Sequence, residues 1–210
     1  DAAEGAAGLV ANALALQAWV PSEHVQQFWN APGWSISAEF FFYACFPWLL
    51  RQRWLSGSAV SFALVMLVFS VLLGLYLAVL WASGLWGATG LAFAARVPLL
   101  GLLPFVVGML CCRLLRRKPH WCHHQGGWTL LAFALLTASA WAADAWAPPQ
   151  AVLLHMLLVS YGVYVPLFAL LIVCLALDNG PLARGLRSPV LVLLGNASYA
   201  LYLLHWLPLG

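Results

Sequence analysis

Apolar residues in this chain run in long blocks that short polar or basic segments interrupt. A helix needs about 20 mostly apolar residues to cross a bilayer. Open strands cannot satisfy their backbone hydrogen bonds in lipid, so the pattern predicts an all-α, polytopic transmembrane helix bundle with about six to seven spans. The six predicted spans are residues 36–50, 58–81, 90–114, 127–144, 151–177 and 189–208, and a shorter block at 5–20 is a candidate for part of a seventh.

The proportion of charged residues supports a membrane location. Hydrophobic residues make up 64% of the chain and charged residues 7%, whereas soluble domains carry about 25% charged residues. So few charges would leave the core of a soluble protein uncovered, and we expect membrane lipid as a partner. The net charge of +3 comes without a basic stripe, so we expect no nucleic-acid partner.

We expect residues 1–210 to form a single membrane-embedded domain. The chain begins at Asp1 without a signal-peptide pattern and ends in the apolar segment 203–210. The domain is therefore expected to be incomplete at the N-terminus, and also at the C-terminus.

The distribution of basic residues predicts the orientation of the spans. Lysine and arginine collect on the cytoplasmic side of membrane proteins, and all but one of the nine here lie in alternating loops. The exception is Arg96, which this orientation places near the outer side, at a depth similar to Glu39 and His205. The cost of leaving a charge unpaired in the bundle predicts that Glu39 and Arg96 form an ion pair. The eight cytoplasmic residues are Arg51, Arg53, Arg113, Arg116, Arg117, Lys118, Arg184 and Arg187.

Glu39 is the most informative single residue, because it places a carboxylate inside a predicted span. An acidic residue at the centre of a span costs roughly 2.5–3.5 kcal/mol. At helical spacing Ser35, Glu39 and Tyr43 share one face, with Ser35 as the predicted N-cap. The carboxylate has a role in function, an ion pair with Arg96, or only a favourable interaction with the helix dipole.

Other polar groups are also predicted near the outer side, and two of them, Arg96 and His205, have two interpretations each. Arg96 either extends to the headgroups or holds a polar or anionic substrate group. Ser198, Tyr202 and His205 project from one face of the last span. His205 is either a group that exchanges a proton or an interfacial residue of the aromatic belt. Glu23, in the outer loop, is expected to be solvated.

A cysteine- and histidine-rich stretch begins near the end of the third span and continues into the loop after it. Its residue types suit zinc, but its spacing matches no zinc-finger pattern, and the basic residues within it would repel a cation. We therefore expect no metal and interpret the stretch as a basic loop near the headgroups. Its members are Cys111, Cys112, His120, Cys122, His123 and His124.

Three segments resemble motifs of the acyltransferase type-three family of integral-membrane O-acyltransferases. Residues 28–43, FWNAPGWSISAEFFFY, with Phe46-Pro47 after them, resemble its WSLS-x-E-x-xFY…FP signature. Arg96 and residues 104–109 resemble an R…EF…GM segment, with proline where the family has glutamate. Residues 194–205, LGNASYALYLLH, resemble the terminal LG-x-x-SY-x-LYLLH segment.

The resemblance implies a multi-pass protein of the bacterial inner membrane that transfers an acetyl or other short acyl group. The implied donor is an acyl-coenzyme A such as acetyl-CoA, and no metal is involved. The implied acceptors are hydroxyls of lipopolysaccharide, of another surface polysaccharide, or of a small molecule. The family's proposed catalytic histidine lies on early helices, and nothing in residues 1–27 matches that segment, so this fragment is expected to lack it.

Residue type and depth predict the roles of the site residues, while the resemblance supports only their presence in motifs. O-acylation needs a base for the acceptor hydroxyl and donors for the developing oxyanion. Two other hypotheses stay open, a transporter or flippase for a polar or glycan substrate and an inactive family member. The catalytic candidates are Glu39, Ser35 and Ser37, and the substrate-binding candidates are Trp34, Arg96, Ser198, Tyr202 and His205.

Overall fold

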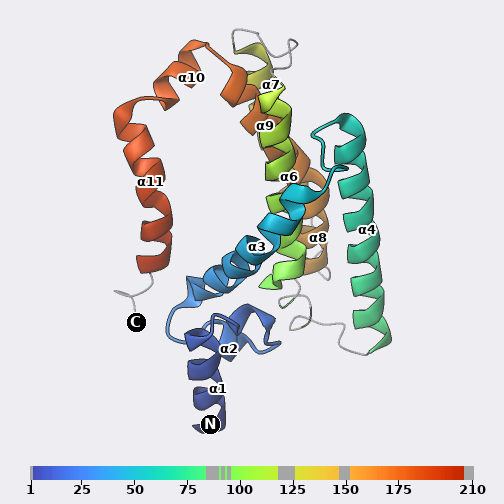
Figure 1. The fold of residues 1–210 in the computed structure, drawn as a ribbon, viewed down its shortest axis with the longest axis vertical. Coiled ribbons are helices and arrows are strands. Elements are labelled where there is room, and N and C mark those ends of the chain that lie inside the picture. Colours follow the sequence, from blue (N-terminus) through green and yellow to red (C-terminus); the bar gives the residue numbers. More distant parts are fainter. Residues whose placement is uncertain are drawn as a thin grey trace. The chain divides into compact units, whose positions relative to one another are not determined.

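The computed structural model describes residues 2–83, 90, 93, 96–117, 126–146 and 152–205. Throughout these residues the regular structure is helical, without a strand (Figure 1). The chain divides into two compact units, one formed by Asp1–Arg51, Leu73–Leu102 and Val190–Gly210 and the other by Gln52–Leu72 and Leu103–Pro189. The prediction of a single domain is not tested by this division.

The helices confirm the all-α, membrane-type architecture. Within the described residues, four helices are long and apolar enough to cross a bilayer: α4 (Ala59–Ala82), α6 (Pro98–Arg116), α7 (Gly127–Ala145) and the continuous helix Leu157–Leu177. The predicted last span is α11 (Pro189–Leu204), which is apolar but only 16 residues long. The predicted first span is α3 (Trp34–Arg51), which is not among the four.

The first unit packs several short elements around the beginning of α3. Gln17 donates a hydrogen bond from Nε2 to the Gly33 carbonyl at 2.8 Å, and the ring of Trp19 packs edge-on against Phe41. A side chain at Gly8 would collide with the Phe28 ring, which lies 2.7 Å from where a Cβ would be. These contacts fix the backbone that leads into α3. The short elements are α1 (Ala2–Ala13), η1 (Gln17–Trp19), α2 (Glu23–Gln26) and η2 (Ala31–Gly33).

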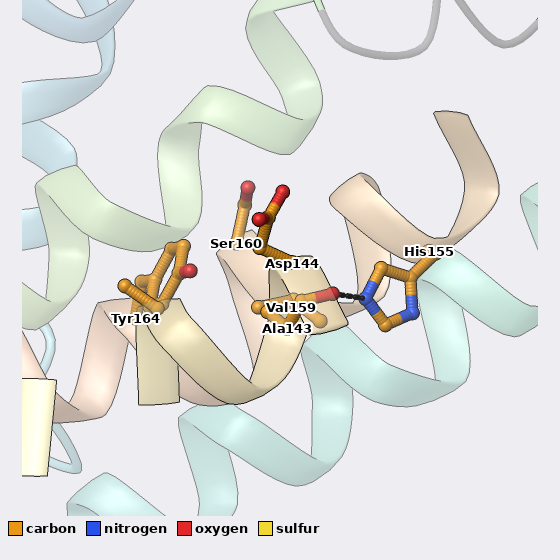
Figure 2. Close-up of a pocket in the computed structure, with 7 residues that line it drawn as sticks. Ala143, Asp144, His155, Val159, Ser160 and Tyr164 are labelled. Atoms are coloured by element: carbon orange, nitrogen blue, oxygen red, sulfur yellow. Dashed lines mark hydrogen bonds between the residues drawn. The ribbon is translucent and has the colours of Figure 1, made fainter. Parts of the chain in front are cut away.

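In the second unit, Pro166 explains a change of helix type. Helix α8 (Val152–Val159) passes through a π-helical turn, η4 (Ser160–Tyr164), into α9 (Val165–Leu177). Proline has no N–H to donate and its ring clashes with the carbonyl four residues earlier, so the helix departs from α geometry just before it. The cavity beside this turn is drawn in Figure 2.

Two further prolines lie in α6, at different positions along the helix. Pro98 is the first residue of α6, where its missing N–H leaves no helical bond unmade. Pro104 lies inside α6, which continues past it.

A buried aspartate joins the ends of three helices in the second unit. Asp178 is 1% exposed and follows α9. Its carboxylate accepts a hydrogen bond at 2.7 Å from the N–H of Gly180, the residue before α10 (Pro181–Leu186). It accepts a second, at 2.8 Å, from the hydroxyl of Thr129 in α7. The Gly180 N–H, followed by the Thr129 hydroxyl, holds the pKa of Asp178 below its ordinary value of 3.8. The carboxylate therefore stabilises the fold in its ionised form.

We predict that this aspartate makes stability depend on pH at the acid end. Because the folded-state pKa is lowered, its contribution is complete above pH 3.8 and declines as pH falls through the folded-state pKa. Thr129→Val, which leaves a buried acceptor without its donor, should lower the unfolding free energy by about 1–3 kcal/mol at neutral pH. Unfolding of the detergent-solubilised protein measures both effects. The control is Thr137→Val, since the Thr137 hydroxyl bonds only to its own helix; an equal loss in both variants would contradict the prediction.

Candidate functional site

The beginning of α3 presents Ser35, Glu39 and Tyr43 on one face, as the helical spacing predicts. The Tyr43 hydroxyl donates to Glu39 Oε2 at 3.2 Å. The Ser35 hydroxyl donates to the Pro32 carbonyl at 2.9 Å. Helix α3 already begins at Trp34, directly after η2, so the prediction that Ser35 is an N-cap is wrong. The carboxylate of Glu39 is half-buried and keeps acceptor capacity beyond the bond from Tyr43.

Helix α11 brings a second motif to this face. The Tyr199 hydroxyl lies close enough to Ser35 and Glu39 to interact with both side chains. Asn30 Nδ2 donates to the Leu203 carbonyl at 3.0 Å, which joins the loop before α3 to the end of α11. The first and last sequence motifs therefore meet, although about 170 residues separate the bonded pair.

Tyr199 and Asn30 are the residues of this site that sequence reasoning missed. Both lie inside the segments that resemble family motifs, and that membership is the only sequence signal that would have pointed to them. Their importance comes from the tertiary contact between the segments.

The predicted residues Ser37 and Trp34 do not join this cluster. Ser37 is 1% exposed, and its hydroxyl oxygen accepts a hydrogen bond from the Ala18 N–H at 3.4 Å. Residues two apart face different sides of a helix, so Ser37 packs toward η1 while Glu39 does not. Trp34 is half-buried at the first position of α3. A catalytic role for Ser37 and substrate binding by Trp34 stay predictions.

Two of the three candidates near the end of α11, Tyr202 and His205, form an exposed row of rings with Tyr199. The Tyr202 ring lies 6.2 Å from the Tyr199 ring and 5.9 Å from the His205 ring, measured between centroids. His205 Nδ1 lies 2.6 Å from the Tyr202 carbonyl, which can only accept, so Nδ1 carries the proton. Ser198 donates to the Gly195 carbonyl of its own helix at 2.7 Å. Tyr199 thus connects Tyr202 and His205 to the Glu39 face.

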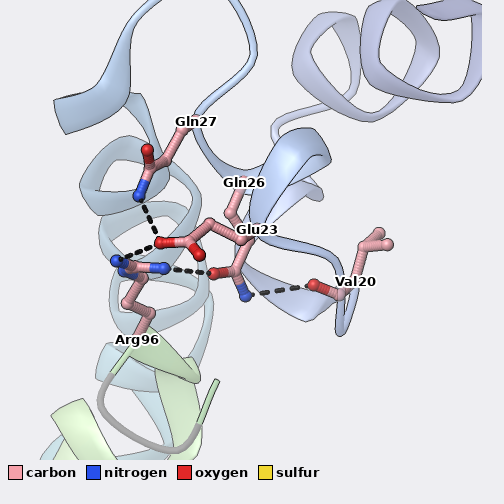
Figure 3. A network of polar contacts seen from close by, with 5 residues as sticks. All are labelled: Val20, Glu23, Gln26, Gln27 and Arg96. Carbon is pink, nitrogen blue, oxygen red and sulfur yellow. Dashed lines mark hydrogen bonds and ion pairs between the residues drawn. The ribbon is translucent and has the colours of Figure 1, made fainter. Parts of the chain in front are cut away.

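Arg96 pairs with a different acid from the one predicted. Its guanidinium bonds to Glu23 Oε1 and to Gln26 Oε1, each at 3.2 Å (Figure 3). Gln27 donates to the same oxygen of Glu23 at 2.9 Å. The predicted Glu39–Arg96 pair is therefore wrong, because shared depth does not determine which elements are neighbours. Glu23, expected to be solvated, is the partner, at 62% exposure against 22% for Arg96.

We predict that the Arg96–Glu23 bridge couples weakly and specifically. Exposed ion pairs contribute about 0.2–1 kcal/mol, so a double-mutant cycle of Arg96→Met and Glu23→Gln on unfolding free energy should give a coupling in that range. The matched control is the cycle of Arg96→Met with Glu39→Gln, which should give none. Coupling confined to the Glu39 cycle would overturn the assignment.

Metal-ligand residue types do not gather within the part of the chain that the structure describes. Cys111 is buried and Cys112 is exposed, so the adjacent pair does not present both thiols to one point. The remaining members of the predicted stretch, His120, Cys122, His123 and His124, lie outside the described residues.

Comparison with known proteins identifies relatives of this chain. The sequence profile described as "Acyltransferase domain" matches residues 4–210. The chain is 32% identical, over 221 aligned positions, to a protein named "Acyltransferase MdmB" from Streptomyces mycarofaciens. The alignment covers 95% of this chain and 50% of that protein, so the chain spans about half the length of the curated relative it matches. No solved structure matches.

Proposed function

This chain belongs to the acyltransferase family, and we propose that its protein is a membrane O-acyltransferase that acts on a hydroxyl group. The observation that supports this most is the convergence of two family-like segments on one polar face. That face combines the Glu39 carboxylate with the hydroxyls of Tyr43 and Tyr199, a set of groups suited to orienting an acceptor hydroxyl.

The proposed reaction is transfer from a thioester to an alcohol. The acceptor oxygen attacks the acyl carbonyl of an acyl-coenzyme A, an oxygen–carbon bond forms, and the carbon–sulfur bond breaks to release coenzyme A as the thiol. The acceptor's proton passes to a general base and then to the departing sulfur. Glu39 orients either the acceptor hydroxyl or the histidine base that the family resemblance implies.

The hydroxyl groups around Glu39 supply hydrogen bonds during this reaction. The Tyr199 hydroxyl lies near both Ser35 and Glu39 and is our first candidate to stabilise the developing oxyanion. The Ser35 hydroxyl hydrogen bonds to Pro32, so Ser35 would accept a bond from the acceptor rather than donate one. Tyr202 and His205, stacked next to Tyr199, extend the surface on which the acceptor would lie.

The proposed setting is the bacterial inner membrane, and the proposed acceptors are hydroxyls of a surface polysaccharide, of lipopolysaccharide or of a small molecule, with O-acetylation as the modification. The four span-length helices support a multi-pass protein. An acetyl group is the simplest acyl group consistent with the family resemblance.

The test is acyl transfer by the whole protein in membrane vesicles supplied with radiolabelled acetyl-CoA. Extracted glycolipid and a panel of small hydroxylated molecules serve as acceptors. We expect label to enter an acceptor as an ester that mild alkali releases. Acceptor movement across the vesicle membrane without any ester would instead favour the transporter hypothesis. The absence of both ester formation and acceptor movement would favour an inactive protein.

A further inference from the structure

A cavity in the second unit, beside the π-helical turn η4, has no part in the proposed reaction. Its volume is about 400 Å³, within the range of small-molecule sites in proteins. Two alanines and a valine form its apolar walls, and Asp144, His155, Ser160 and Tyr164 supply its polar groups. π-Helical turns occur frequently at functional sites, and here the turn itself contributes Ser160 and Tyr164.

The polar side chains of the cavity come from α7, α8 and η4. In Figure 2, Asp144 and Ser160 lie next to one another, with His155 on one side and Tyr164 on the other. His155 Nε2 lies 3.0 Å from the Ala143 carbonyl, which can only accept, so this nitrogen carries a hydrogen. The bond ties α8 to the residue before Asp144. Behind the turn, the ring of Tyr161 packs on Phe69 with 5.1 Å between centroids.

The electrostatics of the cavity favour a cation. Asp144 lies in the last turn of α7, where the helix dipole is already negative. Among the described residues that line the cavity there is no lysine or arginine. Among the described residues, the Asp144 carboxylate has no hydrogen-bond or ion-pair partner. Two negative contributions therefore coincide beside two hydroxyl groups.

We propose that this cavity binds a small organic cation, namely a protonated amine on a hydroxyl-bearing ring of about monosaccharide size. The ammonium group bonds to Asp144, the ring hydroxyls bond to Ser160 and Tyr164, and the apolar face of the ring lies on the alanine and valine side chains. The cavity is lined by residues of the second unit, and this proposal does not depend on the proposed acyl transfer.

The experiment compares glucosamine with glucose, which has the same size and a hydroxyl in place of the ammonium group. Binding to the whole protein in nanodiscs is measured by ligand-observed NMR titration at a pH where the amine is protonated. We expect glucosamine to bind about tenfold or more tightly than glucose, because hydrogen bonds to charged groups outweigh neutral ones. Asp144→Asn should weaken glucosamine binding by about 10- to 100-fold and weaken glucose binding less, because glucose carries no positive charge opposite the carboxylate.

Control variants separate this site from a general effect of charge. Glu4→Gln removes one negative charge from an exposed position of α1 and should leave binding unchanged. Tyr164→Phe should weaken binding by about 2- to 10-fold, which keeps the test decisive if Asp144→Asn does not fold. Equal affinity for the two sugars, no binding of either, or an equal loss in Glu4→Gln and Asp144→Asn would overturn the proposal.

Discussion

The variant Glu39→Gln should accumulate in the membrane like the unmodified protein and yet lose acyl transfer by about 10²- to 10⁴-fold. The substitution keeps the shape of the side chain and removes the charge that would orient the acceptor hydroxyl or the base. Little loss of stability is expected, because Glu39 is half-buried and Arg96 pairs with Glu23 instead. The measurement is the acetyl-CoA-dependent acylation rate divided by the amount of folded protein.

Two variants sharpen this prediction. Tyr43→Phe removes the hydroxyl that donates to Glu39 and should cause a smaller loss, since the charge remains. Glu4→Gln, the same chemical change on an exposed face of α1, should keep full activity. A well-folded Glu39→Gln protein with normal specific activity would remove Glu39 from the mechanism.

Gly57→Ala should be the most destabilising of the substitutions considered, costing about 2 kcal/mol or more. Gly57 has a φ of +75°, and a Cβ there would lie 2.8 Å from the Leu114 backbone nitrogen. The loop before it is held by Arg113, whose guanidinium donates to the carbonyls of Gln52 and Leu55. An added methyl group would push this loop away from the end of α6.

Unfolding in mixed detergent measures the loss. Gly74→Ala in α4 is the matched control, because no described atom outside its own stretch of helix lies within 4 Å of its would-be Cβ and alanine favours a helix over glycine. Gly74→Ala should therefore leave stability equal or slightly higher. Similar stabilities for the two variants would show that the left-handed turn at Gly57 is not required.

The helices could be predicted where apolar character alone defines them. The blocks at 58–81 and 127–144 correspond closely to Ala59–Ala82 and Gly127–Ala145, because a lipid-facing helix is a local property of twenty residues. The π-helical turn inside 151–177 was not predicted. Hydrophobic runs carry no information about helix type, although Pro166 marks the place.

The candidate site was only partly predictable, because helical spacing is a local property and the packing of distant elements is not. The shared face of Ser35, Glu39 and Tyr43 follows from helical spacing and is present. The contact with Tyr199 and the pairing of Arg96 with Glu23 depend on which elements pack together. Charge and depth reduce the number of possible partners for a buried group. They do not show which of these partners the fold places next to it, and here the partner comes from the short helix α2.

The π-helical turn has a consequence for the rotational phase of everything that follows it. A π turn closes a loop one residue wider than an α turn, and one residue corresponds to about 100° of rotation around an α-helix. Deleting Gly162 would let the helix run in plain α geometry and would turn α9 by that angle. Ala169 and Val173, which are now buried, would then face a different direction. The turn therefore determines which side of α9 packs against α7. The same turn also contributes two residues to the wall of the cavity.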